Sequence, residues 1–265
     1  MQRLVMACAL LLLGAVAARS VCGDEKTKIV WKQTGVLPAP EAFQAAAADE
    51  KHVYAITNAL VAKYDRRSGE RLATSTGEAK HLNSGFVWEG KLYCAHSNYP
   101  QTPEGSEIKV LDLESMRLTT IKDFGDFGGS LTWAVRYEDH WWCNFARYGD
   151  DNAKTFLVKC DNEWREHGRW TYPPEVVREL GRMSLSGGLW RDRSLLVTDH
   201  DNLVLYQLRL PKAGRVLEFV GQHSAPFTGQ GIAHDPHTGG LLGINRALRQ
   251  VIFANRQATE PMPKE

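Results

Sequence analysis

A short strand-like segment recurs along this chain every 46 to 49 residues. Each copy is a run of four or five mostly apolar residues, and the copies occupy residues 61–65, 109–112, 157–161, 203–207 and 250–254. Self-similarity at this period is typical of a β-propeller, because one four-stranded blade takes about 40 to 50 residues. The five copies therefore predict an all-β fold, a five-bladed β-propeller, in one domain.

Within each period, turn residues separate runs that have the pattern of β-strands, four to a blade. The first run starts on a small residue and carries a large ring three positions later, which suits the crowded innermost strand of a blade. We expect Trp88, Trp133 and Trp190 to share this strand position and to pack as core rings. The fourth run opens with a basic residue, at positions 71, 117, 165 and 215.

The fifth period lacks a fourth run, because the chain becomes polar from residue 257 onward. Residues 28–31, near the other end of the chain, have the composition of the missing strand. We therefore expect the N-terminal segment to pair with the last blade and close the ring, which removes an exposed sheet edge. An insertion at residues 172–182 has Pro173 and Pro174 near its start and Gly181 near its end, and this pattern predicts a short helix.

The first 23 residues have the pattern of a secretory signal peptide. Arg3 precedes an apolar run at residues 5–16, which is too short to span a bilayer, and small residues follow it. We expect a secreted or periplasmic protein with the propeller at residues 24–256 and a polar tail at residues 257–265. Cys22 leaves lipid attachment open as an alternative. No other apolar run is long enough to cross a membrane, so we do not expect membrane insertion.

The charge of the chain is almost balanced, with 32 Lys and Arg against 31 Asp and Glu. The basic residues are spread along the repeats and do not form a track, so we expect no nucleic-acid partner. We expect a monomer. Cys143 and Cys160 fall on adjacent predicted strands and would form a disulfide if their register matched, whereas a role as small buried residues is the alternative, also for Cys94.

Polar residues gather at one end of the predicted ring, because the loops that enter first strands and those that leave second strands share that end. Converging polar groups in a mostly apolar scaffold are what a small-ligand site needs, although each could instead satisfy backbone groups in a tight loop. The expected ligand-binding residues are Gln44, Asn58, Asn83, His96, Asn98, Asn144, Arg147, Asp201, Gln230, Asn245 and Arg246.

Three further residues at this end could perform acid–base chemistry. His81 and His200 have side chains that titrate near neutral pH, and Glu78 lies three residues before His81. We expect these three to be the catalytic residues of any cyclase, isomerase or lyase activity. No cofactor is indicated, and a metal is not favoured, because ligands from separate blades would have to meet within about 2.2 Å of one ion.

Several segments carry a resemblance to the secreted five-bladed propellers related to glutamine cyclotransferase, and to bacterial propeller proteins labelled cycloisomerase. These segments are residues 40–44, 64–70, 186–190 and 195–199. Members of the cyclotransferase family cyclise an N-terminal glutamine with an acidic residue near the channel mouth. The resemblance implies this role for Glu41 or Glu78.

These observations converge on a secreted propeller that binds a small polar ligand, a sugar or a carboxylate, at its axial mouth. Cyclase, isomerase or lyase activity at that mouth is the enzymatic form of this hypothesis. The alternative is a noncatalytic scaffold whose end face binds a protein or a glycan.

Overall fold

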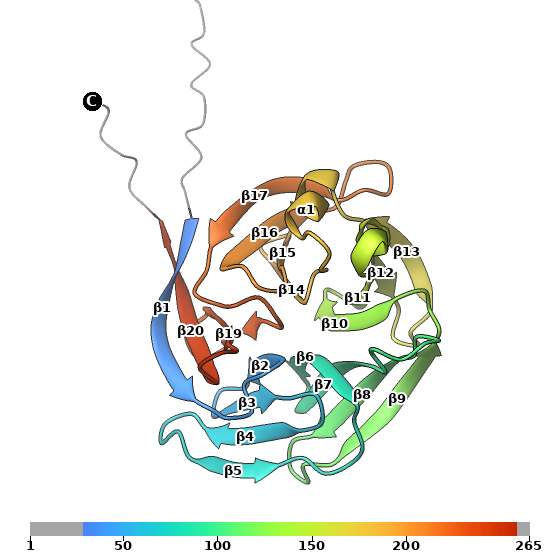
Figure 1. Cartoon of the computed structure of the whole chain (residues 1–265). Helices are drawn as coiled ribbons and strands as arrows, with labels where there is room; N and C mark the ends of the chain where they lie inside the picture. Colours follow the sequence, from blue (N-terminus) through green and yellow to red (C-terminus); the bar gives the residue numbers. More distant parts are fainter. Residues whose placement is uncertain (1–28, 259–265) are drawn as a thin grey trace, which may run out of the picture.

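The computed structural model describes residues 29–258, which fold into sheets arranged around a common centre (Figure 1). The first four-stranded sheet contains β2 (Ala45–Ala48), β3 (His52–Ile56), β4 (Val61–Asp65) and β5 (Arg71–Thr74). The second contains β6 (His81–Trp88), β7 (Lys91–Ser97), β8 (Ser106–Asp112) and β9 (Leu118–Gly125). The third contains β10 (Ser130–Tyr137), β11 (His140–Ala146), β12 (Phe156–Cys160) and β13 (Glu166–Thr171).

The remaining strands form an eight-stranded sheet. In spatial order these are β14 (Gly187–Arg191), β15 (Ser194–Thr198), β16 (Val204–Arg209), β17 (Glu218–Ser224), β1 (Ile29–Pro38), β20 (Gln250–Ala258), β19 (Leu241–Asn245) and β18 (Ala233–His234). Two helical turns, η1 (Gly149–Lys154) and α1 (Pro174–Glu179), lie in connections, and α1 occupies the predicted insertion. The described chain is therefore all-β, with sheets arranged as in a propeller.

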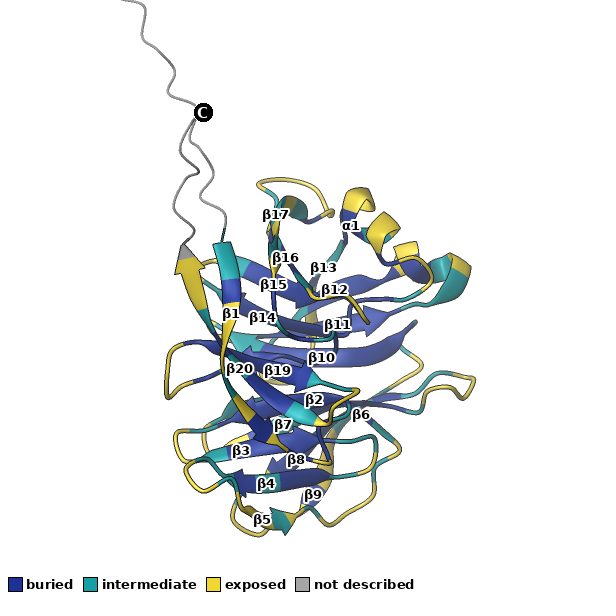
Figure 2. Cartoon of the chain, turned by 60° about the vertical axis from the view of Figure 1, so that its left-hand side comes forward, coloured by how far each residue is buried: buried dark blue, intermediate teal, exposed yellow. Residues whose placement is uncertain are grey.

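Strands that follow one another in the chain form five antiparallel sets, β2–β5, β6–β9, β10–β13, β14–β17 and β18–β20. The repeated segment of the sequence corresponds to the third strand of each set, namely β4, β8, β12, β16 and β20. Consecutive strands within a set are antiparallel neighbours, so each set runs outward from the centre in chain order. Apolar residues fill the spaces between the sheets, and Figure 2 shows that the inner strands are buried whereas the loops and outer edges are exposed. The period in the sequence is thus the repeat of one such set of strands, and the eight-stranded sheet contains two of them.

The first described strand joins the last one, as the sequence analysis predicts. Strand β1 pairs with β20 in antiparallel register from Ile29 opposite Ala258 to Pro38 opposite Gln250 (Figure 1). Its contact with β17 is much smaller, a single parallel pair between Val30 and Ser224. Strand β20 continues through residues 257 and 258, two residues beyond the predicted start of the polar tail.

Trp31 is the largest of the apolar side chains that β1 buries in the core, and Leu37 is another. Trp31 is 4% exposed and belongs to a cluster with Leu189 and Leu196 on one side of the sheet junction and Leu241 and Ile252 on the other. Because β1 is the terminal segment, its strand pairing and this one ring tie the two ends of the described chain together.

The register of the tryptophans differs from the prediction. Trp88 closes the β6–β7 hairpin opposite Lys91, whereas Trp190 lies one pair before the end of its hairpin. Trp133 lies four residues before Tyr137, the last residue of β10, and follows a register shift after Leu131. The three rings therefore do not share one strand position, because the small residue at the start of a strand does not define its register.

The cysteines of the described chain are free thiols buried in the core. Cys160 lies opposite Trp141 and Cys143 lies opposite Val158, so these two cysteines are diagonal neighbours on adjacent strands. Burial raises the pKa of Cys94 to about 12 and also raises that of Cys143. In the described structure the cysteines thus serve as small core residues.

The predicted signal peptide, Cys22 and most of the polar tail lie outside the described residues. No helix within residues 29–258 is long and apolar enough to cross a membrane.

Replacing Trp31 with alanine tests the role of the closing strand. Loss of a buried tryptophan should lower the free energy of unfolding by about 3–5 kcal/mol. The adjacent side chain, Lys32, is exposed, so Lys32→Ala should change it by less than about 0.5 kcal/mol. Urea unfolding of both variants measures the difference, and similar losses in the two variants would show that burial of Trp31 does not secure the closure.

Candidate functional site

A pocket of about 120 Å³ lies where the loops of one end of the ring converge. Every set of strands contributes to it, through the segment that enters its first strand, the start of that strand, or the loop that leaves its second strand. The lining residues are Gln44, His81, Asn83, Tyr99, Thr132, Tyr148, Met183, Ser186, His200, Gln230 and Arg246. We call this cavity the axial pocket.

Arg246 is the only lining residue of the axial pocket with a permanent charge. It follows β19, and its guanidinium lies 4.0 Å from the centre of the Phe43 ring. Burial lowers the pKa of Arg246, which nevertheless remains protonated at neutral pH. None of the residues lining this pocket is Asp or Glu, although Asp201, which lies outside it, favours the charged form of Arg246.

His81 opens β6 beside two tyrosines. Its ring centre lies 5.5 Å from that of Tyr99, which in turn lies 5.4 Å from that of Tyr148. Burial, together with the positive charge of Arg246, lowers the pKa of His81. Burial also raises the pKa of Tyr148. At neutral pH, the pocket therefore contains the neutral imidazole of His81 and the protonated phenol of Tyr148, which can donate and accept hydrogen bonds.

His200 follows β15, and the chain packs tightly around its backbone. Gln230 donates a hydrogen bond from Nε2 to the His200 carbonyl at 3.0 Å. A side chain at Gly229 would come within 2.1 Å of that carbonyl oxygen, and Gly229 has a positive φ of 56°. Oδ1 of Asp201 lies 2.8 Å from Nδ1 of His200. Position 229 therefore requires glycine, and the backbone of His200 is held in place.

The two amide side chains on the other side of the axial pocket are held by hydrogen bonds. Gln44 donates from Nε2 to Oδ1 of Asn58 at 2.5 Å. Asn83 donates from Nδ2 to the Leu131 carbonyl at 2.8 Å. Both side chains are nearly buried, so their orientation is set before any ligand binds.

Asn144 does not line the axial pocket. It is fully buried, its Nδ2 donates to Oγ1 of Thr132 at 2.8 Å, and its Oδ1 accepts from the hydroxyl of Tyr172 at 2.7 Å. Buried neighbours therefore use the hydrogen-bonding groups of this residue, which the sequence analysis expects to contact a ligand. Its role in the structure is to hold Thr132, which does line the pocket.

Other predicted ligand residues lie outside the axial pocket and contact either their own loop or a residue that lines the pocket. Oδ1 of Asn245 accepts from the backbone of Leu248 at 3.1 Å. Arg147 lies 3.6 Å from Asp151, between Nη2 and Oδ2, and is outside the axial pocket. Asn58 and Asp201 are also outside it and contact the lining residues Gln44 and His200.

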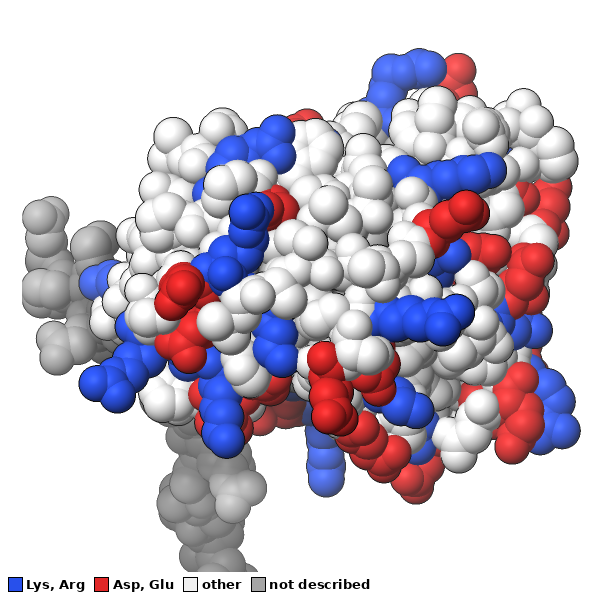
Figure 3. Space-filling view, turned by 90° about the horizontal axis from the view of Figure 1, so that it is seen from below, with Lys and Arg blue, Asp and Glu red and all other residues white. Residues whose placement is uncertain are grey.

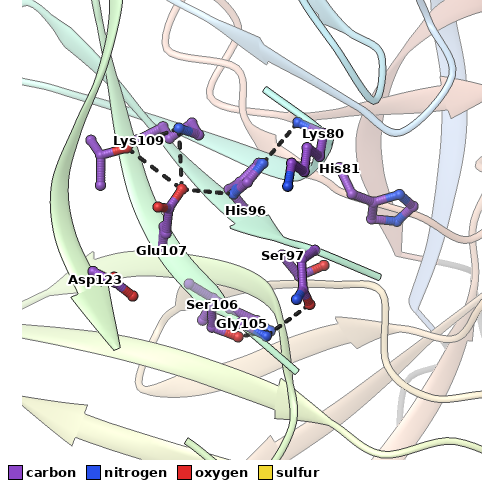
Figure 4. Close-up of polar contacts among 12 residues, drawn as sticks. Lys80, His81, His96, Ser97, Gly105, Ser106, Glu107, Lys109 and Asp123 are labelled. Carbon is purple, nitrogen blue, oxygen red and sulfur yellow. Dashed lines mark hydrogen bonds and ion pairs between the residues drawn. The ribbon is translucent and has the colours of Figure 1, made fainter. Parts of the chain in front are cut away.

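Glu78, His96 and Asn98 lie in a different and larger cavity of about 850 Å³. We call it the lateral cavity, because residues that precede β6 and residues of β7, β8 and β9 line it. Figure 4 shows that His96 contacts Lys80 and Glu107, whereas His81 points away from this group. The three predicted catalytic residues therefore do not meet, since Glu78 is separated from His81 and His200.

The acidic residues implied by the resemblance are both absent from the axial pocket. Glu41 is buried elsewhere and accepts hydrogen bonds from Tyr64 and from Arg71, the latter at 2.6 Å. Burial opposes ionisation of Glu41, but these hydrogen bonds outweigh it and hold its pKa below the ordinary value. Within residues 29–258, no group of three or more His, Cys, Asp or Glu is arranged to hold a metal ion.

Four lining residues were not among those expected from the sequence, namely Tyr99, Thr132, Tyr148 and Met183. Two of them had a signal in the sequence, because Tyr99 and Tyr148 each lie two residues beyond the end of a second strand, as His200 does. Thr132 and Met183 had no such signal in the sequence, because their positions in the pocket depend on how strand β10 and the insertion fold.

Comparison with known proteins supports the fold and gives no family. No protein-family model and no curated protein matches the sequence. The chain is similar in structure to the Myxococcus xanthus glutaminyl cyclase, with a TM-score of 0.62 and 10% identity over 88% of this chain and 99% of that one. At this identity, the similarity shows a propeller-like fold alone.

Two weaker similarities do not add to this result. Kuenenia stuttgartiensis hydrazine synthase has a TM-score of 0.48 and 9% identity, and the match covers 86% of this chain and 71% of that one. A Bacteroides caccae protein of unknown function has a TM-score of 0.46 and 9% identity, with 74% of this chain and 65% of that one covered.

The buried imidazole of His96 makes stability depend on pH. Burial lowers its pKa to about 4, from about 6.5 in an unfolded chain. Between these values the unfolded state binds a proton that the folded state excludes, so stability is complete above about pH 6.5 and decreases as the pH falls toward about 4.

Replacing His96 with glutamine should remove this contribution. When the pH falls from about 7 to about 4.5, the free energy of unfolding should decrease in the wild type. In His96→Gln the decrease should be smaller, by roughly 2–3 kcal/mol. Urea unfolding at the two pH values measures this, with the exposed His237→Gln as the control. Equal pH dependence in all three proteins would contradict the assignment.

Proposed function

We propose that the chain is a five-bladed propeller, in which the eight-stranded sheet comprises two blades. Strands β14 to β17 form one blade and strands β18, β19, β20 and β1 form the other, and each follows the four-strand order of the remaining sheets. The two halves join only through the pair of Val30 and Ser224. The five periods of the sequence support the same count.

We propose that this propeller binds a small organic carboxylate in the axial pocket. The observation that carries the proposal is that Arg246 is the one permanently charged residue lining the pocket. Around it are neutral groups that hydrogen-bond to oxygen, among them Tyr148, Ser186 and Gln230. A guanidinium with such neighbours suits a carboxylate.

The size of the axial pocket restricts the ligand. Its volume of about 120 Å³ is near that of a cavity of about 150 Å³ that accepts benzene. The proposed ligand therefore has roughly four to eight non-hydrogen atoms. This range favours a small hydroxy, oxo or amino acid over an oligosaccharide.

His81 and His200 line the same pocket and suggest proton transfer on the bound carboxylate. A neutral imidazole accepts a proton and returns it at another atom, which is the step that an isomerase or a lyase requires. Cyclisation of a glutamine with the help of an acidic residue is not favoured, since neither Glu41 nor Glu78 lines the pocket. The proposed activity therefore differs from that of the similar cyclase.

The chain would meet this ligand outside the cytoplasm, as the signal-like residues 1–23 suggest. Nucleic acid does not enter the proposal. On the face of the molecule drawn in Figure 3, Lys and Arg are interspersed with Asp and Glu, without a continuous basic track.

Replacing Arg246 with glutamine should abolish binding of small carboxylates. The chain offers a matched control in Arg249, which also lies over Phe43 but is exposed and does not line the pocket. Isothermal titration with two- to six-carbon carboxylates should give binding to the wild type and to Arg249→Gln, but at least about tenfold weaker binding to Arg246→Gln. The corresponding neutral amides should bind weakly to all three proteins.

Two results would overturn the proposed ligand class. One is equal carboxylate binding by the two arginine variants. The other is equal binding of carboxylates and amides to the wild type. Exchange of the Cα hydrogen of a bound carboxylate with ²H₂O tests proton transfer separately, and it should disappear in His81→Gln and His200→Gln while binding persists.

A further inference from the structure

The lateral cavity occupies a position that the β10–β13 sheet fills with aromatic rings. His96 is the fifth residue after Lys91, the first residue of its hairpin strand, and Phe145 is likewise the fifth after His140. His96 pairs with Glu107 across the strands, and Phe145 pairs with Phe156. The two cross-strand pairs are thus equivalent positions in adjacent sheets.

The equivalence extends to the flanking strands. Asp123 pairs with Glu107, as Thr171 pairs with Phe156. Lys109 lies opposite Cys94, as Val158 lies opposite Cys143. A row of ionisable residues in the β6–β9 sheet therefore replaces a mostly apolar row in the β10–β13 sheet.

The packing at the two positions differs accordingly. The rings of Phe145 and Phe156 are stacked with centres 5.3 Å apart, and Phe127 packs on Phe145 at 4.6 Å. His96 and Glu107 instead border the lateral cavity of about 850 Å³. Apolar side chains can therefore fill this position, as they do in the β10–β13 sheet, whereas in the β6–β9 sheet the same position borders a cavity.

Burial of the ionisable row carries an energetic cost. His96 is 5% exposed and Lys109 is 8% exposed. Lys109 donates from Nζ to Thr120 at 2.8 Å and pairs with Oε2 of Glu107 at 3.1 Å (Figure 4). Replacing buried ion pairs with apolar residues of similar volume is often neutral or stabilising. Stability alone therefore gives no reason for this network.

His96 offers the cavity an N–H group. Its Nε2 accepts a hydrogen bond from the backbone of Lys80 at 2.9 Å, so the neutral ring carries its proton on Nδ1. That atom lies 3.0 Å from Oε2 of Glu107 but makes no well-aligned hydrogen bond within the described chain. This ring, which is nine-tenths buried, thus places its N–H beside the Glu107 carboxylate at the wall of the cavity.

The surrounding charge selects the ligand. Five carboxylates line the cavity, against the ammonium groups of Lys80 and Lys109. These carboxylates belong to Glu78, Glu104, Glu107, Asp123 and Asp126. Ala59, Ala79 and Pro103 add apolar surface between them. Separated carboxylates with apolar surface between them complement amino groups joined by methylene chains.

We propose that the lateral cavity is a second binding site, separate from the axial pocket, for an organic cation with two or more amino groups. The carboxylates at the rim bind the ammonium groups, and the apolar residues contact the methylene carbons. The volume lies within the range of about 300–1,000 Å³ that is typical of small-molecule sites.

Spermidine is the probe for this site, measured by isothermal titration at constant ionic strength. The double variant Glu78→Gln with Asp123→Asn removes two rim charges and spares the buried network, since asparagine keeps the oxygen that accepts from Gly125. It should bind spermidine at least about tenfold more weakly than the wild type. Glu114→Gln, an exposed change at the far end of the same sheet, should bind as the wild type does.

A second variant copies the neighbouring sheet. The triple variant combines His96→Phe, Glu107→Phe and Lys109→Val, which are the residues at the equivalent positions of the β10–β13 sheet. It should fold, and it should not bind spermidine. Arg246→Gln should retain it, which separates this site from the axial pocket. No measurable binding to the wild type, or equal binding to the wild type and the Glu78→Gln and Asp123→Asn variant, would overturn the proposal.

Discussion

Pairing of the first described strand with the last is the interaction on which the rest of the structure depends. Strand β1 contributes backbone hydrogen bonds along most of β20, and Trp31 places one large ring among residues of the strands on both sides. An unpaired β20 would leave an open sheet edge. Closure also determines where the loops after β19 stand relative to those before β2, and hence whether Arg246 and Gln44 face one pocket.

Strand order explains why the axial pocket forms at one end. In antiparallel sets, the start of the first strand and the end of the second share an edge, so every set presents two loops to the same end of the ring. The repeat alone assigns Gln44, His81, Asn83, His200, Gln230 and Arg246 to this end, and these residues line the axial pocket. The incomplete fifth period predicted the closing strand, and the prolines and glycine of the insertion predicted the short helix.

Strand order predicts at which end of the ring a residue lies, but not how far the residue lies from the axis. Glu78, His96 and Asn98 lie at the expected end, but beside the β6–β9 sheet and not over the centre. Nor does the sequence show which way a loop residue turns, so Asn144 was assigned to a ligand although buried partners use its amide. The misplaced register of Trp133 has a similar origin, because the shift after Leu131 leaves no mark in the residue pattern.

The two cavities have opposite electrostatic character. Arg246 alone brings permanent charge to the axial pocket, whereas carboxylates dominate the lateral cavity. Each arrangement departs from what packing would favour, through a half-buried cation in one case and a buried ionisable row in the other. The structure of the protein crystallised with a small carboxylate, such as lactate, tests the central assignment most directly. The account predicts that its carboxylate lies against the guanidinium of Arg246 in the axial pocket, and a ligand bound elsewhere on the molecule would contradict it.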